Sequence, residues 1–345
     1  MFNYLLKRLA LMIPTLLGVL TVTFIVIQFV PGGPVEQVLA EARASQKGGE
    51  GSAYKASRDI DKKQVEELKK LYGFDKPAHV RYVEMLGNFA RFDLGRSFMQ
   101  NKDVWSLIKE KLPVSISLGL WTFLLSYLVS IPLGVAKAVR EGSRFDTLTT
   151  TFVLIGFAIP GFVLGVLLIV IFAGGTFLDW FPLRGLVSDN WAELSWPARV
   201  RDYLWHMVLP LSCLMIGSFA VMTQLTKNTF VEEIRKQYVL VARAKGLSQR
   251  RVLYKHIFRN ALIPLVTGFP SAFVGAFFAG SVLIETLFSL DGLGLLGYEA
   301  VIRRDYPVVL GSLYVFTLIG LVVKLVSDLL YVVVDPRVQF EAVAR

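Results

Sequence analysis

The sequence predicts an all-α membrane protein with six transmembrane helices, and three observations support this fold class. Of the 345 residues, 54% are hydrophobic and only 19% are charged, whereas soluble domains carry about 25% charged residues. The apolar residues gather in runs of about 20, long enough for a helix to cross a hydrocarbon core of about 30 Å. Lys and Arg concentrate in alternate connecting segments, as in multi-pass proteins.

The first apolar run predicts an anchor helix that is retained, so that residues 1–30 form a short N-terminus and the first span. Lys7 and Arg8 precede the run, but it is longer than the apolar part of a signal peptide and no small-residue cleavage pattern follows. The other five runs define a transmembrane core over 114–334. The six spans are expected at about 9–30, 114–136, 148–173, 207–226, 261–288 and 308–334.

The distribution of charge predicts the orientation of the chain. Segment 227–260 carries nine Lys/Arg against two Asp/Glu, and segment 137–147 carries three against two. The short loops 174–206 and 289–307 together carry five Lys/Arg against seven Asp/Glu. Because positive loops stay in the cytoplasm, the net charge of +10 reflects topology rather than nucleic-acid binding. We expect both termini, including the tail 335–345, in the cytoplasm and residues 31–113, 174–206 and 289–307 outside.

The long outer segment 31–113 is expected to contain short elements rather than a domain core. PGGP at 31–34 is a turn signal, and the polar, Gly/Ser/Ala-rich stretch 41–61 indicates mobility. VEELKKLYG at 65–73 predicts a short helix that ends at its glycine. The apolar spacing of residues 79–92, after Pro77, predicts a second helix.

Segment 227–260 predicts two helices joined at a glycine. Thr229 and Glu232 have the spacing of a capping box, which predicts a helix from there to Lys245. Gly246 then supplies the C-terminal cap, and Ser248 is placed to cap a second helix. Three roles remain open for this basic segment: contact with anionic lipid, a topology signal only, or docking of the first helix into a partner.

Ionisable side chains inside the predicted spans are candidates for function, because a charge costs about 2.5–3.5 kcal/mol or more at a helix centre in lipid. Glu285 lies near the outer end of the fifth span, and Lys324 and Asp328 lie one turn apart in the sixth. Each can have a purely structural role, Glu285 through hydrogen bonds and the other two as a pair. Each can also line or gate a transport pathway.

Other residues indicate packing rather than chemistry. The single cysteine, Cys213, excludes an intrachain disulfide and makes a metal site improbable. Pro132 and the Pro160–Gly161 step lie inside spans, where they predict kinks. DGLGLLG at 291–297 predicts tight turns, since no strand precedes it as in a nucleotide-binding fingerprint.

Several motifs carry a resemblance to a known family. They are RFDLGRSF at 91–98, KEKLPVSISLGL at 109–120, ARAKG followed by HIFRNALIP at 242–264, ETLFSLDGLGLLGYEAVIRRDYPVVLG at 285–311 and DPR at 335–337. Over nearly the whole chain, the sequence resembles permease subunits of binding-protein-dependent ABC importers, in their peptide and nickel branch. SIPLGVAKAV, EGSRFD and FPLRGLVS resemble a subgroup of peptide importers linked to microcin C uptake. The chain departs from the family at Leu240, where the general loop pattern has Glu, and at Asp291, where the branch more often has proline.

The resemblance implies a type I ABC importer permease fold in a bacterial inner membrane, with residues 31–113 in the periplasm. It implies a second homologous permease chain, ABC ATPase subunits, a periplasmic solute-binding protein, membrane lipids and a peptide substrate as partners. The chain needs no cofactor of its own, since the ATPase subunits would bind ATP and Mg²⁺. The residues expected to couple to the ATPase lie around the helix before Gly246: Glu232, Glu233, Tyr238, Leu240, Ala242, Arg243, Ala244, Lys245 and Gly246.

The sequence lacks the motifs that are typical of ATPases, metalloproteases and esterases. The chain has no G-x-x-x-x-G-K-[ST] phosphate loop and so no ATPase motif of its own. His79, His206 and His256 form no H-E-x-x-H, and G-x-S-x-G does not occur, so neither indicates an enzyme. A membrane enzyme or a receptor stays an alternative to a permease. Nickel stays an alternative to peptide, although the spans offer few of its usual ligands.

Overall fold

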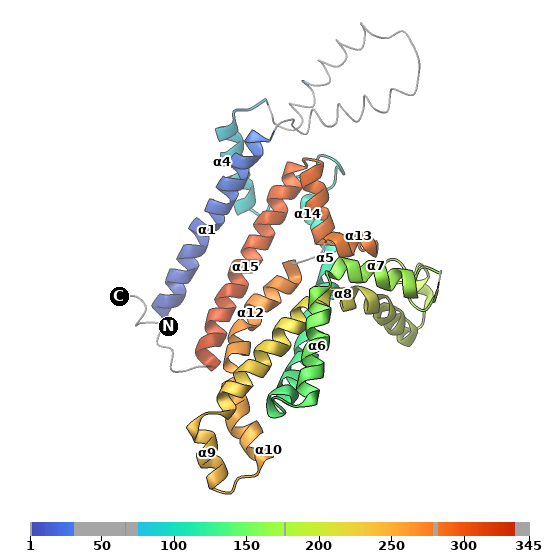
Figure 1. Ribbon diagram of the computed structural model, residues 1–345. Helices are drawn as coiled ribbons and strands as arrows, with labels where there is room; N and C mark the ends of the chain where they lie inside the picture. The colour runs from blue at the N-terminus through green and yellow to red at the C-terminus, as the bar shows by residue number, and fades with distance from the viewer. Residues whose placement is uncertain (1, 31–65, 67–74, 176, 279–281, 335–345) are drawn as a thin grey trace. The chain divides into compact units, whose positions relative to one another are not determined.

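The computed structural model shows a helical chain (Figure 1). It describes residues 2–30, 66, 75–175, 177–278 and 282–334. The turn expected at 31–34, the polar stretch 41–61, nearly all of the helix expected at 65–73 and the tail 335–345 lie outside these described residues. The chain divides into two compact units, and each is described by itself: residues 1–111 with 296–321, and residues 112–295 with 322–345.

The first unit is held together around α4 (Ala78–Ala90). This helix starts after Pro77, as predicted, and packs beside α1 (Phe2–Phe29). The hydroxyls of Thr21 and Tyr82 share a hydrogen bond of 2.6 Å, and the rings of Phe24 and Tyr82 lie 5.2 Å apart between centroids. The first turns of α5 (Val104–Val139), most of α14 (Leu293–Ile302) and the start of α15 (Tyr306–Val334) complete the unit.

The second unit is built on α8 (Trp196–Ile234), its longest helix. Against it pack α6 (Arg144–Ala158), α7 (Gly161–Phe172), α12 (Ile263–Phe278) and α13 (Val282–Leu287). A short 3₁₀ turn, η1 (Trp191–Glu193), precedes α8. The core of the unit joins α5, α8 and α13 through the buried side chains of Leu118, Met207, Leu211, Cys213, Ile284 and Phe288.

Four of the predicted spans correspond to single long helices. Within the described residues, the segments long and apolar enough to cross a membrane are Leu5–Phe29, Val104–Val139, Trp196–Ile234 and Tyr306–Leu329. The second and fourth predicted spans are parts of longer helices, because polar turns of α5 and α8 continue the helix beyond the apolar run. Pro132 lies inside α5 without ending it.

The third predicted span, 148–173, is broken rather than straight. α6 and α7 meet at an angle of 94°, with the break at Ile159 and Pro160. Pro160 has no N–H to donate, and it forces Ile159 into an extended conformation (φ −86°, ψ 119°) that a helix cannot include. The kink predicted at Pro160–Gly161 is therefore confirmed.

The fifth predicted span, 261–288, is not one helix in the described residues. α12 has 16 residues, fewer than a straight span needs, and residues 279–281 between α12 and α13 are not described. The described chain thus holds four candidate spans, or five if the bent pair α6–α7 counts as one. This number does not confirm six.

The predicted capping box at Thr229 is wrong. α8 continues through it to Ile234, and the Thr229 hydroxyl donates to the Thr226 carbonyl at 3.0 Å. A threonine inside a helix satisfies its hydroxyl this way, so the local motif does not start a new helix. The new helix, α9 (Gln237–Ala244), begins after Lys236.

The glycine and the serine after α9 behave as predicted. Gly246 has a φ of +77°, the left-handed conformation expected of a C-terminal cap. The Ser248 side chain accepts a hydrogen bond from the Arg251 N–H at the start of α10 (Gln249–Arg251). The π-helix η2 (Val252–Ile257) and α11 (Phe258–Ala261) follow and lead to α12.

Candidate functional site

The corner between α8 and α9 is closed by a carboxylate. Glu233, in the last turn of α8, is buried and accepts a hydrogen bond of 2.6 Å from the Tyr238 hydroxyl. Its other oxygen accepts from the Lys236 ammonium, and this hydrogen bond raises the pKa of Lys236 above its ordinary value. Burial, with the bond to Glu233, raises the pKa of Tyr238, so its hydroxyl keeps its proton at neutral pH and donates. Two residues expected to couple to the ATPase, Glu233 and Tyr238, thus contact each other.

Helix α9 has one face inside the protein and one outside. Val239 and Ala242 are buried in a cluster with Val135 of α5 and Phe230 of α8. On the outer face, Leu240 is 60% exposed. Glu232 is exposed as well. The remaining residues predicted to couple to the ATPase are exposed: Arg243, Ala244, Lys245 and Gly246.

Two adjacent apolar side chains of α9 are exposed. Leu240 and its neighbour Val241, which is 53% exposed, lie next to exposed cationic residues. Exposed apolar groups rimmed by polar ones mark docking sites on proteins. The outer face of α9 therefore has the composition of a surface that a partner covers.

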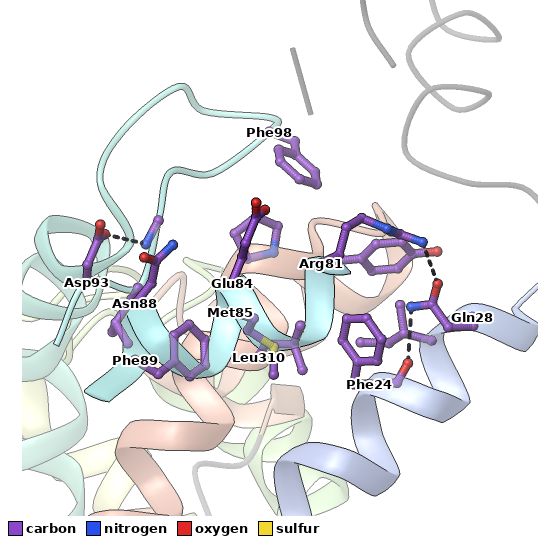
Figure 2. Close-up of a pocket in the computed structure, with 15 residues that line it drawn as sticks. Phe24, Gln28, Arg81, Glu84, Met85, Asn88, Phe89, Asp93, Phe98 and Leu310 are labelled. Atoms are coloured by element: carbon purple, nitrogen blue, oxygen red, sulfur yellow. Dashed lines mark hydrogen bonds between the residues drawn. The ribbon is translucent and has the colours of Figure 1, made fainter. Parts of the chain in front are cut away.

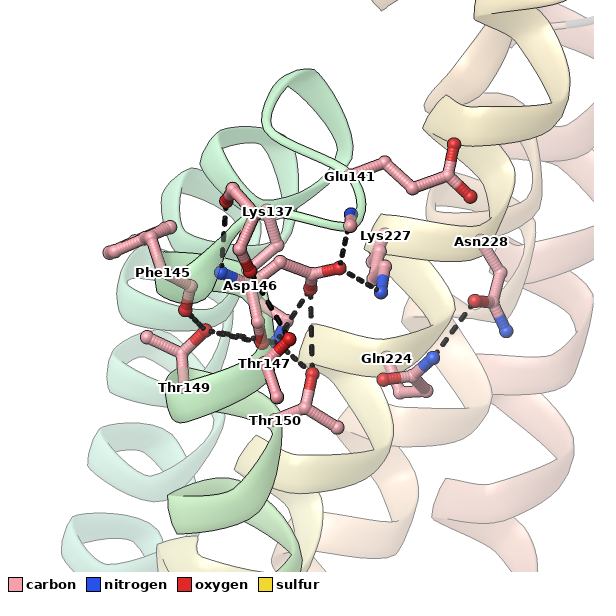
Figure 3. A network of polar contacts seen from close by, with 12 residues as sticks. Lys137, Glu141, Phe145, Asp146, Thr147, Thr149, Thr150, Gln224, Lys227 and Asn228 are labelled. Carbon is pink, nitrogen blue, oxygen red and sulfur yellow. Dashed lines mark hydrogen bonds and ion pairs between the residues drawn. The ribbon is translucent and has the colours of Figure 1, made fainter.

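Close to this corner lies a buried cluster of charge that the sequence alone did not reveal (Figure 3). Lys137 of α5 is 0% exposed, and its Nζ lies 3.2 Å from an Asp146 carboxylate oxygen. The same Nζ donates to the hydroxyls of Thr149 (3.0 Å) and Thr150 (2.6 Å) and to the Asp146 carbonyl (3.1 Å). Lys227 of α8 reaches the other Asp146 oxygen at 2.7 Å. Removing one partner of a buried pair costs about 3–5 kcal/mol, so this cluster fixes three helices together.

A tight turn positions Asp146 for this role. Gly142 has a φ of +75°, which reverses the chain between α5 and α6, and its N–H donates to the Asp146 carboxylate at 3.2 Å. Ser143 caps α6 by accepting from the Asp146 N–H. The aspartate therefore stands in the first helical turn, where the helix dipole favours a negative charge.

Polar and small residues continue this contact along α5 and α8. The Ser130 hydroxyl donates to the Phe219 carbonyl at 3.1 Å. A Cβ added to Gly134 would lie 2.5 Å from the Thr226 Cβ, so the two backbones approach as only glycine permits. In the sequence, Lys137 is only one of the positive charges of segment 137–147. Its place one turn after Gly134 was the available signal, but no local pattern linked it to Asp146 and Lys227.

Glu285 lies in α13, is fully buried and serves as a cap for α14. Its carboxylate accepts a hydrogen bond of 2.6 Å from the Leu295 N–H, while the Ser115 hydroxyl accepts one of 2.8 Å from the Leu293 N–H. A Cβ on Gly292 would lie 2.7 Å from the carboxyl carbon. These contacts are those of a structural hydrogen-bonding role, and a gate role stays a prediction.

The other two intramembrane candidates lie on α15. The Lys324 side chain is exposed and that of Asp328 is partly buried. The described contacts assign neither residue to the lining of a pathway. Their role as a structural pair or as pathway residues stays a prediction.

The first unit contains a cavity of about 250 Å³ between α1, α4 and the start of α15 (Figure 2). Apolar side chains such as Phe24 and Leu310 form one part of its wall, and Gln28, Arg81 and Glu84 add polar groups. The Arg81 guanidinium donates to Gln28 at 2.7 Å, and burial lowers the pKa of Arg81 from its ordinary value. The cavity therefore combines apolar walls with polar groups on its rim.

The metal-ligand chemistry of the described residues is sparse. No three His, Cys, Asp or Glu side chains in the described ranges are arranged to hold a metal ion. Cys213 is buried in α8. The His206 Nδ1 lies 2.8 Å from the Asp202 carbonyl and 3.6 Å from its carboxylate, within one helix.

Comparisons with known proteins agree on one family. A family profile described as "Binding-protein-dependent transport system inner membrane component" matches residues 130–340. The chain is 54% identical to the peptidoglycan transport system permease protein YejB of Agrobacterium fabrum (strain C58), with 98% of each chain covered. It is 51% identical to the inner membrane ABC transporter permease protein YejB of Escherichia coli O157:H7, over 98% of this chain and 99% of that protein. The oligopeptide transport system permease protein AppB of Bacillus subtilis (strain 168) is 33% identical, over 99% and 100%.

A solved structure supports the fold. The inward-facing MetNI methionine ABC transporter contains a chain that aligns with a TM-score of 0.51 at 16% identity, over 67% of this chain and 97% of that one. At this identity the likeness shows the fold alone. The profile match includes α9, the Lys137 cluster and Glu285. The resemblance drawn from the motifs is thus confirmed, and the chain belongs to the family of binding-protein-dependent transport system inner membrane components.

Proposed function

We propose that this chain is the transmembrane permease subunit of an ABC importer for oligopeptides or peptide-like compounds in a bacterial inner membrane. The observation that carries the proposal is the identity of 51–54% to two YejB permeases over nearly the full length of each. A more distant relative of the same length is named as an oligopeptide permease. The chain contributes a passage and a coupling surface rather than a catalytic site.

Within this substrate class, the proposed cargo is a peptide-like compound of the kind that YejB proteins handle. One YejB relative is named for peptidoglycan transport, and the subgroup resemblance adds microcin C. Among the described residues, the candidate nickel ligands already have other partners. His206 faces Asp202 of its own helix, and Glu285 accepts a hydrogen bond from α14. These contacts favour peptides over a metal ion as cargo.

The importer is assembled from several chains. A second, homologous permease chain forms the passage together with this one, because the few spans of one chain enclose little room for an oligopeptide. ABC ATPase subunits bind ATP and Mg²⁺ on the cytoplasmic side, and a periplasmic solute-binding protein delivers the peptide. Membrane lipids surround the spans.

Helix α9 is the contact with the ATPase in this proposal. Its exposed residues Leu240, Val241 and Arg243 dock into a groove of that subunit. Its buried residues Val239 and Ala242 tie it to α5 and α8. A rigid-body shift of the ATPase then moves the spans, as in other domain-level transitions. Glu233 and Tyr238 hold the corner in place instead of contacting the partner.

The membrane topology has six spans with both termini in the cytoplasm. The bent pair α6–α7 is the third span, and α12 with α13 is the fifth. The charge bias of segments 137–147 and 227–260 supports this orientation. Residues 31–113 lie in the periplasm and contact the solute-binding protein.

Purification from native membranes followed by reconstitution tests the function. The tagged chain should bring a second permease and ABC ATPase chains with it, identified by mass spectrometry. In proteoliposomes, the complex with its binding protein should import a labelled oligopeptide only when ATP is supplied. Repeated recovery of the chain alone, or uptake of nickel in place of peptide, would contradict the proposal and favour a membrane enzyme, a receptor or a metal importer.

A further inference from the structure

The buried cation of Lys137 joins α5 to α6 through a complete set of acceptors. Its Nζ has three protons to donate, and the two Thr hydroxyls, the Asp146 carbonyl and the Asp146 carboxylate all lie within 3.2 Å. Only 1% of the side chain is exposed. Separating the two helices here would leave a buried charge without acceptors, so the contact has little freedom to open.

The Asp146 carboxylate is shared between two helices. One oxygen faces Lys137 of α5, and the other accepts from Lys227 of α8 at 2.7 Å (Figure 3). One anion therefore serves two cations. Because Lys227 is only 16% exposed, its ammonium group also needs this partner in place of water. The cytoplasmic ends of α5, α6 and α8 thus meet at a single carboxyl group.

The same turns of α5 also hold α9 on another side. Val135 and Ala138, which flank Lys137 in the sequence, are buried in one cluster with Val239 and Ala242 of α9. The close approach of Gly134 to Thr226 locks α5 against α8 at the same level. A movement of α9 therefore acts on the part of α5 that carries the charge cluster.

We propose that Lys137, Asp146 and Lys227 are positioning residues that join the cytoplasmic ends of α5, α6 and α8 into one rigid block carrying α9. A displacement of α9 then reaches α6, and the bent span that α6 begins, instead of being lost in bending between helices. The inference rests on the proposed function, because it assigns the block to transmission of the ATPase movement. A cluster that served folding alone would affect the amount of assembled importer and not the coupling.

The first test removes Lys227, the cation that α8 contributes to the cluster. Lys227→Met leaves the balanced pair of Lys137 and Asp146 in place, and Lys227→Arg restores a cation. In the full importer complex in proteoliposomes, we expect Lys227→Met to lower the peptide imported per ATP hydrolysed by about tenfold. Lys227→Arg should recover most of that loss. Arg235→Gln is the matched control. The exposed pair of Arg235 with Glu141 also joins the end of α8 to the turn between α5 and α6. The peptide imported per ATP hydrolysed should equal that of the wild type in this variant.

A milder pair of variants covers the outcome that Lys227→Met fails to assemble. Thr150→Val keeps the shape of the side chain and removes one acceptor of Lys137, whereas the adjacent Thr151 is exposed and donates only within its own helix. We expect Thr150→Val to lower the ratio of import to ATP hydrolysis and Thr151→Val to leave it unchanged. Equal ratios in both variants and the wild type would overturn the proposal.

A distance measurement tests rigidity without depending on transport. Spin labels at two exposed sites, Leu148 of α6 and Val221 of α8, report the separation of these helices in the nucleotide-free and ATP-trapped complex. The wild-type distance distribution should be the same in both states and should broaden in Lys227→Met. A wild-type distance that changes with nucleotide would refute the proposal that α6 and α8 move as one rigid block. A wild-type complex that imports no peptide would instead refute the proposed function, and the distance result would still stand.

Discussion

The buried Glu285 carboxylate restricts which residue fits beside it. It occupies the space in which a side chain at position 292 would start, and it accepts the Leu295 N–H. The glycine at position 292 is therefore required by its contact with Glu285 of α13. Sequence patterns indicate the turn, but not the contact.

We predict that Gly292→Ala destabilises the chain. Its Cβ would stand 2.7 Å from the Glu285 carboxyl group, which is buried and cannot move into water. Overpacking of this kind costs about 1–3 kcal/mol. Thermal unfolding of the detergent-purified importer complex measures the loss. Gly297→Ala, in the helix α14 that follows Gly292, is the control, since nothing lies within 4 Å of its Cβ. Equal unfolding temperatures for both variants would contradict the prediction.

Substitution of Glu285 itself separates its two possible roles. Glu285→Gln keeps an oxygen to accept the Leu295 N–H, whereas Glu285→Ala leaves that buried donor unsatisfied, at about 1–3 kcal/mol. We expect the alanine variant to lower stability and the glutamine variant to keep both stability and peptide uptake. Loss of uptake in the stable glutamine variant would show that the charge serves the pathway.

At the scale of the element, α9 depends on how its two ends are closed. The Glu233–Tyr238 hydrogen bond closes the first end and the left-handed Gly246 closes the second. A short helix of eight residues is marginal by itself, so these closures and the buried Val239 and Ala242 define its orientation.

Gly246→Val is predicted to weaken coupling. A β-branched residue at a φ of +77° is strained by about 1 kcal/mol or more, which shifts the end of α9. ATP hydrolysis stimulated by loaded binding protein should fall, while membrane insertion is retained. Gly246→Asn is the control because Asn tolerates this conformation, and a valine variant that couples like the wild type would argue against the role of α9.

At the scale of the whole molecule, topology follows from charge and span count together. The described residues contain helices for four spans and a bent fifth, and the basic segments alternate with less basic ones. Residues 141 and 189 lie in a basic and an acidic loop on either side of the bent pair α6–α7. With this pair as one span, the two residues are expected on opposite sides of the membrane.

Cysteine labelling tests this topology. In a Cys213→Ala background, which removes the single native cysteine, the exposed residues Glu141 and Asp189 are replaced one at a time by cysteine. An impermeant maleimide applied to intact cells should label only the variant at 189, and inverted vesicles should reverse the result. Labelling of both variants from the same side would rule out the proposed orientation.

The sequence alone determined the features that depend on local chemistry and on composition. Apolar runs located the long helices, proline located the break at 160, and Gly246 and Ser248 located the turn after α9. These features need only the solubility of a segment in lipid or the conformational preference of one residue. The capping box at Thr229 failed because a local motif cannot compete with a helix that continues from both sides.

Only the tertiary structure decided which distant residues meet. Lys137, Asp146 and Lys227 come from three helices. Ser115 of α5 and Glu285 of α13 accept N–H groups at the start of α14, and Glu285 lies against Gly292. In the sequence, the two lysines are only loop charges and Gly292 is only a turn residue. Their roles arise because burial removes water from charged and polar groups, which must then find partners wherever the fold brings them.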